Sequence, residues 1–243
     1  MEIIKLNATD STNSFLKSLL QNSTPRNFTV VVTTNQTKGR GQLEKNWNSE
    51  PHKNLTFSVF ISFKNLKIIH QKYLNFAISQ AIHNVLLSKN LLKTHIKWPN
   101  DILSANKKIC GILIENTFFG ENIKNAIVGI GLNVNQEKFP ESINNPTSLK
   151  LETSIEFDLE KLLKEILIEL EEKINLLELK KFKLLEENYL NVLYKKDIPS
   201  MFKNNNGDVF MGIISGISND GKLQIKLEDN STEEYGIKEV SFL

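Results

Sequence analysis

Hydrophobic and polar positions follow two different periods along this chain, and the periods divide it into strands and helices. Residues 54–63 carry apolar side chains at every second position, the pattern of a strand with one buried face. Residues 71–90 instead repeat apolar positions every three to four residues, as on a helix that packs against a sheet. The pattern therefore predicts a protein that combines helices and strands.

The same two patterns predict the other elements of the first 195 residues. Residues 11–21 begin with hydroxyl and amide side chains that can cap a helix, and apolar positions at helical spacing follow. Residues 158–194 predict two helices, broken at 175–181. Pro99 lacks an amide hydrogen and is expected to end the strand before it, while Asn106-Lys107 predicts a turn. Further strands are predicted at 28–34, 93–98, 108–115 and 123–135.

The pattern changes again in the last segment. From residue 196 to 243, short strand-like runs alternate with Asn204-Asn205-Asn206-Gly207 and Asn219-Asp220-Gly221, which suit hairpin turns because Asn and Gly tolerate positive φ. We therefore expect a small barrel-like β domain at 196–243 after a larger domain at 1–195. This boundary depends only on the switch from a helix pattern to a hairpin pattern.

Composition excludes several classes of protein. Thirty basic and 28 acidic residues leave a formal charge of +2, and the lysines lie among glutamates, so no nucleic-acid partner is expected. Cys110 is the single cysteine, which fits a reducing compartment, and residues 1–4 lack the features of a signal peptide. No segment has the length needed to span a bilayer. We expect a cytoplasmic protein without a membrane partner.

Candidate chemistry begins at Gly39-Arg40-Gly41-Gln42. Glycines around one arginine let the backbone turn through conformations closed to other residues, aim its N–H groups at a ligand and hold a cation beside them. Such a loop suits an anion. The motif alone leaves open that it is a mobile surface hairpin.

Four further motifs follow: one lies at the start of the helix predicted at 11–21, and three lie at or near the ends of strand-like runs, where a pocket could form. Each also has an ordinary interpretation: a helix cap for the first, a core tryptophan in the second, a solvated lysine and a small buried cysteine in the third, and tight strand packing for the last. Their succession along one chain points to an enzyme. The motifs are Ser11-Thr12-Asn13, Lys97-Trp98-Pro99-Asn100-Asp101, Lys107-Lys108-Ile109-Cys110-Gly111 and Gly129-Ile130-Gly131-Leu132-Asn133.

In this order and spacing, the motifs resemble those of biotin protein ligases of the monofunctional type. The resemblance implies an α+β fold: a catalytic domain like the class II aminoacyl-tRNA synthetases and biotin synthetases, with a mixed sheet and helices, followed by a small SH3-like barrel. It also implies an activity. Members of the family join biotin to ATP, release pyrophosphate, and transfer biotin from biotinyl-5′-AMP to a specific lysine of a biotin carboxyl carrier domain.

The resemblance also implies roles for single residues. Lys108, Arg40 and Asp101 are the expected catalytic residues. Lys108 and Arg40 would bring an anionic carboxylate and a triphosphate together. Biotin is expected to bind at Ser11, Thr12, Asn13, Gln36, Arg40, Gly41, Gln42, Lys108 and Gly111. ATP is expected to bind at Gly39, Arg40, Trp47, Lys97, Asn100 and Asn133, with the Trp47 ring against adenine.

The resemblance further implies a metal ion and a protein partner. Mg²⁺ is expected to bridge phosphate oxygens, with Asp101 as its nearest carboxylate, directly or through water. The four histidines show no metal-ligand spacing. The expected partner is the carrier domain of a biotin-dependent carboxylase, and family members occur as monomers and as homodimers.

One stretch departs from the family pattern, and three other functions stay open. Leu43-Glu44-Lys45-Asn46 replaces a stretch that is usually basic and contains a glycine, which places a carboxylate near the expected phosphates. Lipoate–protein ligases share the fold and the adenylate chemistry. A non-catalytic biotin-binding module would keep the pocket alone. A DNA-binding biotin regulator is disfavoured, because the motifs begin at Ser11 and leave no room for a helix-turn-helix domain before them.

Overall fold

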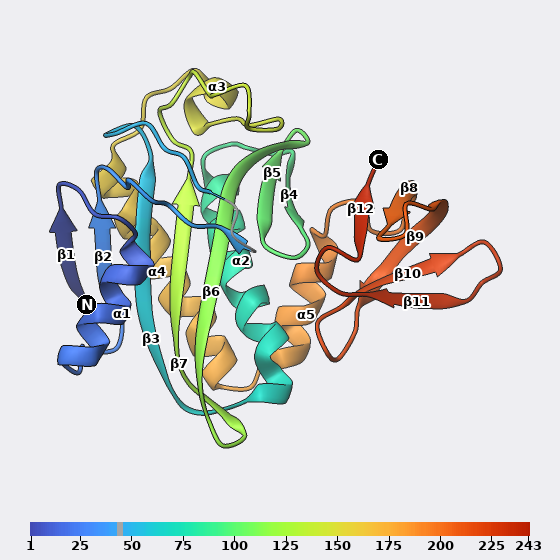
Figure 1. Cartoon of the computed structure of the whole chain (residues 1–243), viewed down its shortest axis with the longest axis horizontal. Coiled ribbons are helices and arrows are strands. Elements are labelled where there is room, and N and C mark those ends of the chain that lie inside the picture. The colour runs from blue at the N-terminus through green and yellow to red at the C-terminus, as the bar shows by residue number, and fades with distance from the viewer. Residues whose placement is uncertain (43–45) are drawn as a thin grey trace.

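The computed structural model describes residues 1–42 and 46–243 and folds them into two separate β-sheets (Figure 1). The larger sheet has the strand order β1-β2-β3-β7-β6-β5-β4. β1 and β2 pair in parallel and the remaining neighbours pair antiparallel, so the sheet is mixed. Its strands are β1 (Glu2–Leu6), β2 (Thr29–Thr33), β3 (Leu55–Lys67), β4 (Thr94–Lys97), β5 (Asp101–Ser104), β6 (Lys107–Phe119) and β7 (Asn122–Leu132).

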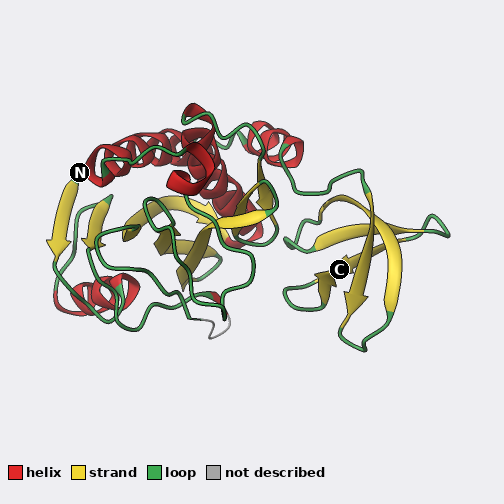
Figure 2. Cartoon of the chain, turned by 90° about the horizontal axis from the view of Figure 1, so that it is seen from above, coloured by secondary structure: helices red, strands yellow, loops and turns green. Residues whose placement is uncertain are grey.

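Helices cover both faces of the larger sheet. α1 lies on one face, and α2 and α4 form a layer on the other, as the view from above shows (Figure 2). A 3₁₀ turn, η2, leads into α2, and the short α3 follows β7 in the chain. The bounds are α1 (Thr12–Asn22), η2 (Ile68–His70), α2 (Gln71–Ser88), α3 (Leu149–Thr153), α4 (Leu159–Glu178) and α5 (Phe182–Asn191).

Strand alternation decides which face each apolar side chain covers. Phe57, Val59 and Ile61 of β3 pack into the large core with α2 and α4. Phe60 lies on the opposite face, in a smaller cluster with Leu16 of α1. Successive side chains of a strand point to opposite faces, so the intervening positions of β3, Thr56 and Ser58, share the α1 face. The large core stabilises the sheet from behind, and the part of the α1 face beside the small cluster is left for polar residues.

The C-terminal strands form a second, antiparallel sheet in the order β11-β10-β9-β8-β12. A hydrophobic cluster joins this sheet to the larger domain, with Ile96, Trp98 and Tyr189 packed with Phe202 and Ile214. The strands are β8 (Pro199–Asn204), β9 (Val209–Ile217), β10 (Leu223–Leu227), β11 (Thr232–Tyr235) and β12 (Val240–Phe242).

The structure confirms most of the predicted elements, including the mixed α+β architecture and the β-rich tail. The Ser11 side chain caps α1 by accepting a hydrogen bond from the Ser14 amide. The predicted strand at 123–135 is too long, because β7 ends at Leu132. β1, β5 and α3 were not predicted; each is only four or five residues long and shows little periodicity. The domain boundary at 195/196 stays a prediction.

Candidate active site

A row of paired residues crosses the α1 face of the larger sheet and forms the floor of the site. Thr56 of β3 pairs with Gly131 of β7, which pairs with Gly111 of β6. Gly111 pairs with Asp101 of β5, and Asp101 with Lys97 of β4. Directly opposite residues of antiparallel strands point to the same face. The row therefore has small residues at its centre and an acidic and a basic residue at one end.

The central glycines allow other parts of the chain to lie directly on the sheet. A Cβ atom at Gly131 would lie 2.2 Å from the Trp47 indole ring, and one at Gly129 would lie 2.5 Å from Asn13 Oδ1. Real Cβ atoms do not approach other heavy atoms so closely. Gly131 and Gly129 are two residues apart on β7, so Trp47 and Asn13 lie side by side on this strand.

The start of α1 contributes a network of polar side chains. The Thr12 amide donates to Gln36 Oε1 at 2.9 Å, and the Thr12 hydroxyl lies 2.6 Å from Ser58 Oγ. Ser58 also bonds to Asn13 Oδ1. Ser11, Thr12 and Asn13 are all buried. These neutral donors and acceptors line one end of a cavity.

The glycine loop is closed at its base and carries Arg40 towards α1. The Trp47 amide donates to the Gly39 carbonyl at 2.9 Å, and Arg40 forms a β-bridge with Asn46. Arg40 Nη2 donates to Ser14 Oγ at 3.2 Å and lies 3.6 Å from Glu115 Oε2. Leu43, Glu44 and Lys45, where the sequence departs from the family pattern, lie outside the described residues.

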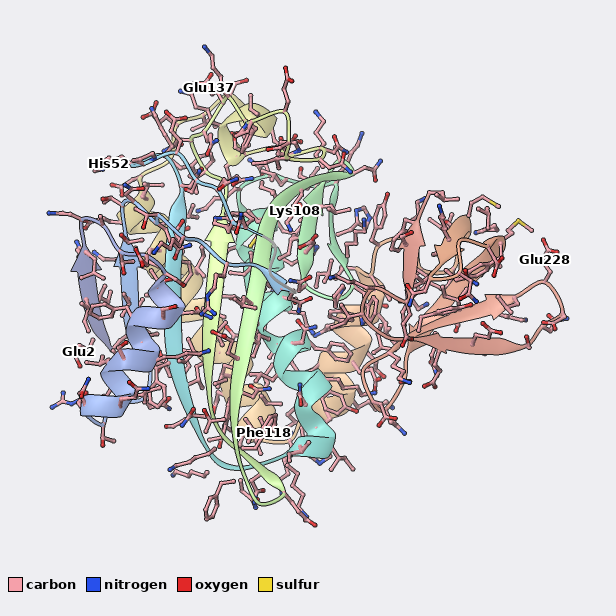
Figure 3. All side chains as sticks on the ribbon, viewed as in Figure 1. Glu2, His52, Lys108, Phe118, Glu137 and Glu228 are labelled. Atoms are coloured by element: carbon pink, nitrogen blue, oxygen red, sulfur yellow. The ribbon has the colours of Figure 1, made fainter. Side chains whose placement is uncertain are left out.

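Lys108 and Asp101 form an ion pair at the other end of the cavity. Lys108 Nζ lies 2.6 Å from Asp101 Oδ1 and 5.8 Å from the centre of the Trp47 ring. Figure 3 shows Lys108 on the upper part of β6. The backbone of Lys108 is held by a loop, because its amide donates to the Asn145 carbonyl and its carbonyl accepts from the Thr147 amide.

One cavity of about 680 Å³ brings these residues together. Its size is that of a site for a small organic ligand. Arg40 and Lys108 both face it, as do most residues that the sequence singled out. The predicted residues that line it are Ser11, Thr12, Asn13, Gln36, Arg40, Gly41, Gln42, Trp47, Lys97, Asn100, Asp101, Lys108 and Gly111.

Two predicted ATP-binding residues are absent from the cavity lining. Asn133 is buried, and its Nδ2 donates to the Thr147 carbonyl at 2.9 Å; its role towards ATP stays a prediction. The Gly39 carbonyl accepts a hydrogen bond from the Trp47 amide, and a Cβ at Gly39 would lie 2.2 Å from the Trp47 carbonyl oxygen. In this structure Asn133 anchors a loop, and Gly39 permits the turn that places Trp47.

Some lining residues had no signal in the sequence. Asn144 lies in the polar loop after β7, where nothing distinguishes it from its neighbours. The C-terminal sheet forms a further part of the wall, and Lys97 Nζ lies 4.8 Å from the centre of the Phe242 ring. The lining residues from this sheet and its loops are Leu223, Ile237, Lys238, Val240, Ser241 and Phe242.

The charges in the cavity favour an anionic ligand. Arg40, Lys97, Lys108 and Lys238 line it, and Asp101 is the one carboxylate among the lining residues that the structure describes. Burial raises the pKa of the nearby Cys110 thiol, so this side chain is an inert core residue. Within the described ranges, no three histidine, cysteine or acidic side chains meet as a protein-built metal site would require.

Comparison with known proteins places the chain in a family. The sequence profile of the Biotin/lipoate A/B protein ligase family matches residues 6–133, more than half of the chain. The chain belongs to this family. No helix formed by residues 1–42 or 46–243 has the length and apolar character needed to cross a membrane.

Individual relatives narrow the comparison. The chain is 30% identical over 161 residues to the bifunctional ligase/repressor BirA of Bacillus spizizenii, covering 65% of this chain and 49% of that protein. It is 27% identical over 172 residues to the biotin–[acetyl-CoA-carboxylase] ligase of Mycobacterium tuberculosis, covering 68% and 61%. The chain thus spans about half the length of the Bacillus relatives that it matches.

A solved structure covers the whole chain. The biotin protein ligase of Aquifex aeolicus, in complex with biotin and ATP, superposes with a TM-score of 0.81 at 27% identity, covering 100% of this chain and 98% of that one. The likeness includes the C-terminal sheet. It confirms the expected fold, a biotin protein ligase catalytic domain followed by a small SH3-like domain.

Proposed function

We propose that this chain is an ATP-dependent biotin–protein ligase. It would activate biotin as biotinyl-5′-AMP, with release of pyrophosphate, and transfer biotin to a lysine of a biotin carboxyl carrier domain. The observation that carries the proposal is that Arg40 and Lys108 line the same cavity, between the neutral network of α1 and the wall of the C-terminal sheet. Membership of the family and the biotin- and ATP-bound relative support it.

The cavity supplies what the first step needs. The biotin carboxylate must attack the α-phosphorus of ATP, and the two anionic groups repel each other at contact distance. Lys108 would neutralise the carboxylate and then the developing negative charge on the phosphate oxygens. Thr12, Asn13 and Gln36 would hold the neutral ureido end, where hydrogen bonds match a cyclic urea and charge adds little. Holding both reactants at fixed positions lowers the entropic part of the barrier.

Trp47 belongs more naturally to the biotin side than to the adenine side. Its ring lies on Gly131 next to Asn13, and its Nε1 is buried without a hydrogen-bond partner in the structure. A flat apolar ring at this place would pack along the hydrocarbon arm of biotin. The nucleotide would then lie towards Lys97, Asn100 and the C-terminal wall.

A magnesium ion would reach this site with ATP rather than occupy a site built by the protein. Asp101, the described lining carboxylate, is already paired with Lys108. Mg²⁺ commonly keeps several waters and is held by substrate phosphates with one or two carboxylates. Asp101 therefore fits a contact through water, and the remaining ligands would be phosphate oxygens and waters.

The second step requires a neutral amine, although a free lysine has a pKa of about 10.4. The cations around the cavity would disfavour the ammonium form of the incoming lysine, and Asp101 is placed to accept its proton if Lys108 has moved to the phosphate. The carrier domain is the proposed acceptor because the family transfers biotin to it.

Biotin-dependent exchange of labelled pyrophosphate into ATP tests the first step. Wild-type protein should catalyse exchange with biotin and not with lipoate, which distinguishes the two ligase classes. Lys108→Ala should lower kcat/KM for exchange by about 100- to 1,000-fold, the typical cost of removing one transition-state contact. Lys107→Ala is the matched control, because Lys107 is exposed and does not line the cavity. Exchange with lipoate alone, or none with either acid, would reject the proposal.

A further inference from the structure

Glu115 is a partly buried carboxylate that contacts residues of the cavity, and no sequence motif singled it out. It lies on β6 four residues after Gly111, and alternation places its side chain on the α1 face. Its side chain is 22% exposed and does not line the cavity. Any effect of Glu115 on a ligand must therefore act through the residues that it contacts.

Those contacts include two residues of the proposed site. Glu115 Oε2 accepts a hydrogen bond from Asn13 Nδ2 at 2.7 Å and lies 3.6 Å from Arg40 Nη2. Glu115 Oε1 accepts from Lys17 Nζ at 2.6 Å. Burial alone would raise the pKa of Glu115, but the hydrogen bonds from Lys17 and Asn13 outweigh it and lower the pKa. The group is thus an ionised acceptor near neutral pH.

An ionised carboxylate can only accept hydrogen bonds, so it determines which way the Asn13 amide faces. The NH₂ group must point to Glu115, and Asn13 Oδ1 then faces Ser58. The single hydroxyl hydrogen of Ser58 is used on Asn13 Oδ1. The 2.6 Å contact between Ser58 Oγ and Thr12 Oγ1 joins Thr12 to the same network, and the Thr12 hydroxyl donates to Gln36 Oε1 at 3.3 Å. The Glu115 carboxylate thus sets the direction of two hydrogen bonds, from Asn13 to Glu115 and from Ser58 to Asn13.

We infer that Glu115 is a positioning residue for biotin recognition, which acts with the buried Ser58 to fix the donor and acceptor pattern that Asn13 and Thr12 present to the ureido group. The inference rests on the proposed function and deepens it. A ureido ring carries one acceptor oxygen and two N–H donors, so it fits one arrangement of the network better than the reversed one. The same carboxylate holds Arg40 against α1 and so links the glycine loop to this network.

The Glu115→Gln variant removes the negative charge of the side chain and keeps its shape. The glutamine amide can present either oxygen or nitrogen to Asn13, so the amide of Asn13 is free to turn. The KM for biotin should rise about 10-fold, which is the scale of one hydrogen bond to a charged group, and the KM for ATP should change less than 2-fold. Glu115→Asp keeps the acceptor and should recover part of the biotin affinity.

2-Iminobiotin supplies a readout that a merely structural role would not move. It replaces the ureido oxygen with an imino nitrogen, which is protonated at neutral pH, so the ring loses its acceptor and gains N–H donors together with a positive charge. Wild-type protein should prefer biotin, measured as the ratio of the two dissociation constants by calorimetry. Glu115→Gln should shrink this ratio several-fold, because either amide orientation of Asn13 becomes accessible.

Glu186→Gln is the matched control, since Glu186 is also partly buried and paired with a lysine, Lys72 at 2.8 Å, but contacts none of these residues. Its KM for biotin, and its ratio of dissociation constants for 2-iminobiotin and biotin, should stay at wild-type values. Unfolding midpoints without ligand check that each variant is folded. If wild type binds biotin and catalyses exchange while Glu115→Gln keeps both the KM and the ratio, the inference is wrong and the proposed function stands. If wild type does neither, the proposed function itself is wrong.

Discussion

Lys108 Nζ and Asp101 Oδ1 meet at 2.6 Å across two neighbouring strands, so the proposed catalytic cation is held by the cavity's own acidic residue before any ligand binds. Both side chains are partly exposed, at 33% and 26%, so the pair contributes little to stability. The ion pair instead fixes the orientation of the Lys108 side chain. The carboxylate keeps the flexible lysine at the end of the glycine floor, where the substrate carboxylate and phosphate are proposed to meet.

Asp101→Asn tests this orientation. The variant keeps the shape of the side chain and removes the charge that holds Lys108, so we expect about a 10-fold lower kcat for pyrophosphate exchange, a smaller loss than for Lys108→Ala. The unfolding midpoint should stay close to wild type, because the pair is partly exposed and so contributes little to stability. A double variant Asp101→Asn with Lys108→Ala should cost no more than Lys108→Ala alone if both residues act as one unit. Additive losses would show that Asp101 acts independently.

Gly131→Ala should disturb the site more than the fold. A Cβ at this position would lie 2.2 Å from the Trp47 ring, so the ring must move away from the floor. We expect at least a 10-fold weaker biotin affinity by calorimetry and a destabilisation of about 1–3 kcal/mol by urea unfolding. Gly216→Ala is the control in another strand, where the nearest atom is the end of a flexible side chain, Gln224 Oε1 at 3.3 Å. Wild-type biotin affinity in Gly131→Ala would contradict the role given to Trp47.

The sequence predicted the parts of the site that depend on local pattern. The α1 cap, the glycine loop and the strand ends could be found because capping, turns and alternation act over a few residues. The row from Thr56 through Gly131 and Gly111 to Asp101 could not be found in this way. It depends on strand register, which is set by packing of whole strands and is not legible in one sequence.

The contacts of three residues could not be predicted from local sequence patterns. Glu115 has the position of an ordinary strand residue, and its contacts with Asn13 and Arg40 span about 100 and 75 residues of sequence. Asn133 follows a glycine-rich strand end, and its Nδ2 donates to the Thr147 carbonyl, a contact that the local pattern did not predict. Phe242 belongs to a tail with no recognisable motif, and its place beside Lys97 follows from how the two sheets pack.

Phe242→Leu tests whether the C-terminal sheet assists the nucleotide. The ring lies 4.8 Å from Lys97 Nζ, a distance at which a cation over an aromatic face is stabilised by roughly 0.5–2 kcal/mol. Leucine keeps an apolar side chain and removes that attraction, so the KM for ATP should rise about 2- to 10-fold while the KM for biotin changes little. Phe119→Leu is the control, because Phe119 is 76% exposed at the end of β6 and outside the cavity. Equal effects on both substrates would argue that Phe242 supports only the fold.

His83 predicts how stability depends on pH. This residue of α2 is 3% exposed, and its Nε2 lies 3.0 Å from the Thr94 carbonyl, so the neutral ring donates that hydrogen bond. Burial lowers the pKa of His83 below the ordinary value of 6.5, and the hydrogen bonds to Thr94 and Asn84 offset this only in part. The unfolded chain therefore binds a proton more readily than the folded one as the pH falls below 6.5. The free energy of unfolding should be greatest above pH 6.5 on this account and fall as the pH approaches the folded-state pKa.

Urea unfolding of wild type and His83→Gln across this range isolates the contribution. Glutamine retains an amide hydrogen for Thr94 but does not titrate, so the variant should lose the part of the pH slope that His83 supplies. Its stability at pH 7.5 should be lower by about 1 kcal/mol or more, because the amide fills the buried site less well than the ring. The two curves should converge towards acid pH, where the wild-type histidine takes up its proton. Parallel curves from pH 7.5 to pH 5 would show that His83 is not the titrating group.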